Sequence, residues 1–200
     1  MSYVRRGLLL IAVLVAALVV GTFVHEVIGH GLTAVALGGQ VTRVVILGVE
    51  FYPSLDFVGW PIVSGYGRID TDGVAAGPRT HLVDLAGSMS TWFVAVLANL
   101  LLWTRRRWYG WPKAVVIMLS IFWIDLFTYT LPSWGMRRSV LWGPRDVSEP
   151  YDAAVALGIN GDTFRAFVII TCCAMLLSLV LHWYRGRRYC AESTTGKPDE

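Results

Sequence analysis

The amino-acid sequence predicts an all-α polytopic membrane protein, with about four transmembrane helices and a small membrane-associated β element after the first helix. Of its 200 residues, 55% are hydrophobic and only 16% are charged, whereas about a quarter of a soluble domain is charged. The apolar residues are gathered into blocks of about 20 or more, the length that crosses a hydrocarbon core about 30 Å thick. The blocks lack the ten-residue alternation of a β-barrel, so we expect helical spans.

Four apolar blocks are the expected spans: residues 7–37, 82–103, 114–134 and 164–184. The first block follows Arg5 and Arg6, as the apolar part of a signal peptide would. It is too long for that part, however, and it lacks an A-x-A-like cleavage site. It is also too long for one perpendicular helix, so we expect it to tilt, break or leave the membrane near Gly29 and Gly31.

The segments between the blocks predict the remaining elements. Residues 41–51 are β-branched and partly alternating, which predicts one or two strands. Residues 53–78 are rich in Gly, Pro and Asp and are predicted to form a loop. A short helix is expected over residues 150–157, closed by Gly158. Residues 191–200 are predicted to be a disordered tail, which leaves residues 1–190 as a single integral membrane domain.

The charge pattern predicts the orientation and excludes one class of partner. The net charge of +3 is small, and the arginines do not form a stripe interleaved with exposed aromatic residues, so nucleic-acid binding has no support. With four spans, ten basic residues fall on the side of the two termini and seven on the other side. Both termini are therefore predicted to be cytoplasmic, in a protein of the plasma membrane in contact with the lipid bilayer.

The ionisable residues His25, Glu26 and His30 lie in the motif HEVIGH near the end of the first block. Ionisable groups at membrane depth are costly and usually mark a functional site. Two imidazoles can bind Zn²⁺, and an adjacent carboxylate can take a proton from the attacking water. In the alternative interpretation, these side chains only form hydrogen bonds between helices or lie at the membrane interface.

The sequence GTFVHEVIGHGLTAVALGG, followed by a β-rich segment, resembles the site-2 protease family of intramembrane zinc metalloproteases. The resemblance covers residues 19–51, and residues 85–99 look like the later Gly-rich helix of that family. It implies a zinc metalloendopeptidase in which His25 and His30 bind Zn²⁺ and Glu26 is the general base. It also implies that residues 41–51 offer a sheet edge to the substrate, a membrane-spanning protein segment.

The alternative function is non-catalytic: a membrane scaffold, or a degenerate protease homologue, that binds metal or a partner membrane protein. A metal transporter is disfavoured, because only the first block carries a dense set of ligands. Zinc content and cleavage after replacement of Glu26 distinguish an enzyme from a scaffold.

The spacing of the two histidines departs from the family pattern HExxH, because His25 and His30 are five residues apart. Positions five apart lie about 140° apart around a regular helix, so both imidazoles could not reach one ion. We therefore predict a π-bulge in this segment, for which Gly29 is suited because it has no Cβ. The alternative is a regular helix in which Glu26 and His30, four apart, are the ligands.

A catalytic zinc needs a third protein ligand, and the resemblance implies an Asp from a later segment. Asp152 is the first choice and Asp125 the alternative, with Glu149 a weaker third candidate. Asp152 could instead be an ordinary residue in the first turn of a helix. Asp125 could instead form a hydrogen bond between helices, for example to Asn99 or Thr128.

Overall fold

The computed structural model describes residues 3–59, 67–104, 111–130 and 149–194. Its helices are α1 (Tyr3–Phe23), the π-helix η1 (Val24–Gly31), α2 (Leu32–Ala36), α4 (Pro78–Thr104), α5 (Trp111–Ser120), α6 (Trp123–Thr130), α8 (Glu149–Ala156) and α9 (Gly161–Thr194). Its strands are β1 (Gln40–Ile46), β2 (Val49–Tyr52), β3 (Asp56–Phe57) and β4 (Gly67–Asp72). The predicted combination of helices and a small β element is confirmed.

Four helical segments of the described chain are long and apolar enough to cross a membrane: Ile11–Ala36, Pro78–Thr104, Trp111–Thr130 and Gly161–Arg185. They match the four predicted blocks, although residues 131–134 of the third block lie outside the described residues. The short helix predicted over residues 150–157 is confirmed as α8. The prediction of a disordered tail from residue 191 is wrong for residues 191–194, which continue α9, and residues 195–200 lie outside the described part.

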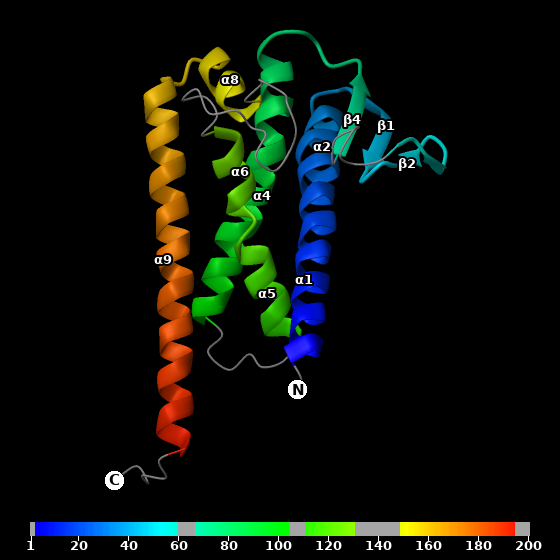
Figure 1. The fold of residues 1–200 in the computed structure, drawn as a ribbon. Helices are drawn as coiled ribbons and strands as arrows, with labels where there is room; N and C mark the ends of the chain where they lie inside the picture. The colour runs from blue at the N-terminus through cyan, green and yellow to red at the C-terminus, as the bar shows by residue number, and fades with distance from the viewer. Residues whose placement is uncertain (1–2, 60–66, 105–110, 131–148, 195–200) are drawn as a thin grey trace.

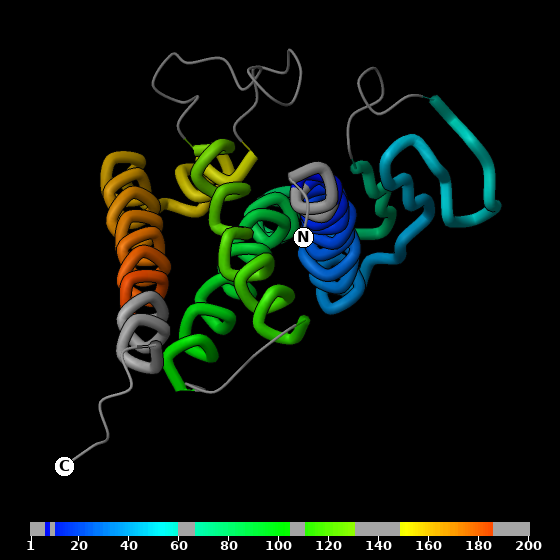
Figure 2. Tube along the Cα trace, turned by 60° about the horizontal axis from the view of Figure 1, so that its bottom comes forward, coloured from blue at the N-terminus to red at the C-terminus, as the bar shows by residue number. Residues whose placement is uncertain are grey.

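Helix α4 lies between α1 and α9, and α5 and α6 fill the space beside it (Figures 1 and 2). Leu126 and Val168 are fully buried in the main apolar core, which α4, α6, α8 and α9 share. The start of α1 and the end of α9 lie at the same end of the bundle (Figure 1). The placement of both termini on the cytoplasmic side of a membrane stays a prediction.

The strands form an antiparallel sheet in the order β3-β2-β1-β4, at the end of the bundle opposite the two described ends (Figure 1). Strands β1 and β2 confirm the prediction for residues 41–51. The prediction that residues 53–78 are all loop is wrong, because this segment contains β3 and β4. The polar sequence of β4 carries little strand signal, and it forms a strand because it pairs with β1 along its length. As a result β1 is an inner strand and β4 is an edge among the described strands.

Candidate metal centre

The segment that carries the HEVIGH motif is a π-helix, η1, inserted between α1 and α2. The predicted helix distortion is therefore confirmed. Gly29 lies where η1 crosses α4, and a Cβ at this position would be 2.5 Å from the Cα of Gly87 and 2.7 Å from the carbonyl oxygen of Ala86. Only glycines allow the two backbones to approach so closely, as at other crossings of apolar helices through small residues.

The widened turn brings the two histidines of the motif onto one face. Nε2 of His25 and Nε2 of His30 are 3.1 Å apart, and both side chains are buried. Their rings meet edge to face, with centroids 4.8 Å apart. The alternative of a regular helix in which His25 turns away from His30 is wrong.

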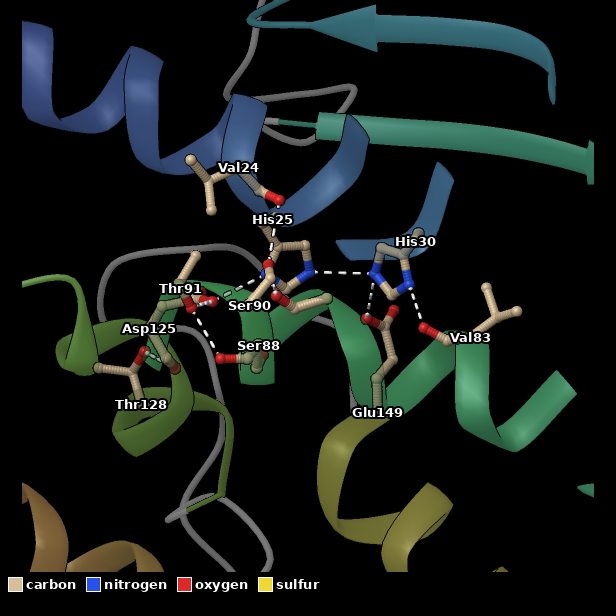
Figure 3. A network of polar contacts seen from close by, with 11 residues as sticks. Val24, His25, His30, Val83, Ser88, Ser90, Thr91, Asp125, Thr128 and Glu149 are labelled. Carbon is tan, nitrogen blue, oxygen red and sulfur yellow. Dashed lines mark hydrogen bonds and ion pairs between the residues drawn. The ribbon is translucent and has the colours of Figure 1, made fainter. Parts of the chain in front are cut away.

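The other ring nitrogen of each histidine contacts a hydrogen-bond acceptor (Figure 3). Nδ1 of His25 donates to a carboxylate oxygen of Asp125 at 2.7 Å. Nδ1 of His30 donates to the backbone carbonyl oxygen of Val83, also at 2.7 Å. A carbonyl oxygen and an ionised carboxylate can only accept, so both Nδ1 atoms carry the proton. In the neutral rings, both Nε2 atoms therefore present a lone pair to each other.

The first residue of α8, Glu149, completes a group of possible metal ligands with the two histidines. Its Oε2 atom is 4.0 Å from Nε2 of His30, and the three ligand atoms all lie within 4.8 Å of one another. Tetrahedral zinc with bonds of about 2.0–2.1 Å separates its ligand atoms by about 3.3 Å. The two imidazole nitrogens are close to that separation. To reach it, the carboxylate must approach Nε2 of His30 by about 0.7 Å and Nε2 of His25 by up to about 1.5 Å.

The backbone of helix α4 lies close to both imidazoles at this point, because residue 87 is glycine. A Cβ on Gly87 would lie 2.7 Å from Nε2 of His25 and closer still to Nε2 of His30. Any side chain at residue 87 would thus collide with both nitrogens. The donor set, two histidines and a glutamate, is one that catalytic zinc sites use. The residues present therefore fit the predicted Zn²⁺.

Glu26, the predicted general base, is buried and follows His25 in the sequence, but its side chain faces the sheet. A Cβ on Gly67, the first residue of β4, would lie 2.6 Å from Oε1 of Glu26 and 2.6 Å from the Cγ2 of Thr22. The carboxylate of Glu26 therefore lies between η1 and the start of the edge strand. It is not one of the three residues that form the ligand group.

Neither of the two aspartates predicted as the third ligand belongs to the ligand group that contains Glu149. Asp152 is exposed and lies outside the ligand group, because α8 buries Pro150, Ala153 and Ala154 and turns Asp152 away. Asp125 contacts Nδ1 of His25 and lies away from the paired Nε2 atoms (Figure 3). The geometry thus favours the weaker sequence candidate, Glu149. The small residues of α8, three and four positions apart, were a signal for its buried face.

Comparisons of the chain with protein-family models, with curated proteins and with solved structures found no significant match. The resemblance to site-2 proteases therefore rests on the sequence motif alone.

Proposed function

We propose that the chain is a zinc-dependent intramembrane protease of the site-2 protease type. His25, His30 and Glu149 would hold the metal, and Glu26 would act as the general base. The proposal replaces Asp152 by Glu149 as third ligand, because Glu149 is the carboxylate that lies beside His30.

The observation that carries the proposal is the pair of facing nitrogens. Both Nδ1 atoms donate to acceptors, so two lone pairs face each other 3.1 Å apart in a buried site. Buried polar atoms without a partner are costly, and a cation between these two would satisfy both. A proton shared between the two Nε2 atoms would also satisfy both lone pairs, but it would not involve the nearby carboxylate of Glu149. A divalent metal uses all three groups.

The surroundings of the ligand group support peptide hydrolysis in particular. Bound zinc supplies Lewis-acid polarisation of the scissile carbonyl. Glu26 would take the proton of the attacking water and pass it to the leaving amine. The edge strand β4 begins beside Glu26, so a substrate segment that unwinds and adds to this edge would lie near the base. Local unwinding is needed because a helix hides its carbonyl groups in its own hydrogen bonds.

The non-catalytic alternative, a membrane scaffold that binds metal, would use the same ligands but not Glu26. The two functions are distinguished by zinc content and cleavage, measured on the same purified variants in detergent and in proteoliposomes. The substrates are a panel of single-span peptides with a fluorophore on one side and a quencher on the other.

We expect one zinc per chain in the wild type, and none after His25→Ala or His30→Ala. Glu26→Gln should keep its zinc and lose cleavage of every peptide that the wild type cleaves, because the amide cannot take the proton. Equal zinc content in the wild type and in both histidine variants would refute the metal site. Zinc binding without cleavage of any peptide by the wild type would favour the scaffold.

A further inference from the structure

Asp125 is an acidic residue inside the third predicted span, and the proposed chemistry does not use it. It lies in α6, which begins after a break in the helix at Ile121–Phe122. Asn99 of α4 donates a hydrogen bond to the carbonyl oxygen of Ser120 at this break, at 3.1 Å. The break is therefore supported by a specific contact, and it separates the helix that carries Asp125 from α5.

The carboxylate of Asp125 bridges two helices at the metal centre. Its Oδ2 atom accepts hydrogen bonds from Nδ1 of His25 at 2.7 Å and from the hydroxyl of Thr91 at 2.8 Å. Thr91 is fully buried in α4, and its hydroxyl is also 2.8 Å from the carbonyl oxygen of Ser88. The ring of Tyr129 packs against His25, with centroids 5.3 Å apart. The position of the carboxylate oxygen is thus set by α4 as well as by α6.

We propose that Asp125 and Thr91 are positioning residues that hold His25 as the Nδ1-protonated tautomer with Nε2 aimed at the metal. This inference rests on the proposed function, because it assigns the orientation of one of its ligands. An ionised carboxylate can only accept, so it selects the tautomer whose Nε2 lone pair is free. A carboxylate behind a ligating histidine also raises the basicity of the ligand. The backbone carbonyl of Val83 does the same for His30 without charge.

Asp125→Asn is the sharpest test, because the amide has the same shape but can present either an oxygen or an NH₂ group to Nδ1. The variant should keep the fold and lose the selection of the tautomer. Thr91→Val removes the donor that fixes the carboxylate, and Thr91→Ser restores it. Asp162→Asn is the matched control, because Asp162 has an 89% exposed side chain and lies far along the chain in α9.

Zinc affinity is measured by competition with a chromophoric chelator in detergent. We expect about 10- to 100-fold weaker binding after Asp125→Asn or Thr91→Val, and near wild-type affinity for Thr91→Ser and Asp162→Asn. The absorption spectrum of the Co²⁺-loaded protein should keep its band positions in Asp125→Asn, because the ligands are unchanged. A shifted spectrum would indicate that Asp125 is itself a ligand and would overturn the proposal. Wild-type zinc affinity in both Asp125→Asn and Thr91→Val would also overturn it.

A second measurement keeps this test separate from that of the proposed function. ¹⁵N NMR of the metal-free protein reports the tautomer of His25 whether or not the chain binds zinc. We expect the Nδ1–H form in the wild type and a mixture of tautomers in Asp125→Asn. The Nε2–H form in the wild type would overturn the proposal. A wild type that shows the Nδ1–H form but binds no zinc would refute the metal centre and leave the role of Asp125 in orienting His25 standing.

Discussion

Replacement of Gly87 by alanine should remove the metal while leaving most of the fold intact. The added Cβ would lie 2.7 Å from Nε2 of His25 and closer still to Nε2 of His30. Ordinary contact begins at 3.4 Å, so the imidazole of His25 must retreat by about 0.7 Å, and His30 must move further. Ligand distances in a metal site tolerate only about 0.2 Å. The displacement exceeds that tolerance about threefold for one ligand and more for the other.

The cost of this variant to stability should be moderate. One extra methyl group in a packed interior typically costs about 1–3 kcal/mol. Gly21→Ala is the matched control, because it also adds a methyl group to a helix long and apolar enough to span a membrane, but meets Phe122 at an ordinary 3.8 Å. Bound zinc and the midpoint of thermal unfolding would be measured for both variants in the same detergent.

We expect Gly21→Ala to bind zinc like the wild type, and Gly87→Ala to lose stoichiometric binding while still unfolding cooperatively. Normal zinc affinity in a folded Gly87→Ala protein would show that the two Nε2 atoms are not the face that holds the metal. That result would refute the reasoning from the facing nitrogens.

Three further predictions follow from the same geometry. Glu149→Ala should weaken zinc binding by at least about tenfold, whereas Asp152→Ala, an exposed position on the same helix, should leave it unchanged; the reverse order in a chelator competition would restore Asp152 as the ligand. Gly67→Ala places a methyl group 2.6 Å from Oε1 of Glu26, so cleavage should fall at unchanged zinc content, and parallel loss of both would show that Gly67 supports the fold instead of the base. Chelation of the metal should lower the unfolding midpoint of the wild type, since a ligand at 100 times its dissociation constant stabilises by about 2.7 kcal/mol; an equal shift in His25→Ala would show that the chelator acts elsewhere.

Composition and periodicity predicted most of the secondary structure of the bundle. Apolar blocks of sufficient length determine where helices can span, because a bilayer requires every backbone polar group to be paired within its own segment. The distortion of the HEVIGH helix was also predictable. Five-residue spacing cannot bring two imidazoles together on a regular helix, and a π-helix removes that conflict.

The edge strand β4 could not be predicted from its own residues, because strand pairing is a long-range interaction. The segment GRIDTD is polar and follows a Gly- and Pro-rich stretch, so its local signals favoured a loop. Its ladder of hydrogen bonds with β1 decides the outcome. The sheet edge that we propose for substrate binding is consequently β4, and not residues 41–51 as predicted.

The sequence by itself determined the four apolar helices that are long enough to span a membrane and the distortion at the HEVIGH motif, because these depend on local composition and spacing. Only the tertiary structure decided which acid joins the two histidines of this motif. Three acids lie in or near the later apolar helices: Glu149, Asp125 and Asp152. The sequence alone ranked Asp152 above Glu149 as the third ligand, whereas the structure places Glu149 with the histidines. The packing of α8 through its alanines and the break before α6 place one carboxylate beside His30 and another behind His25. Such placements depend on how separate helices meet, and sequence spacing carries no information about contacts between residues a hundred positions apart.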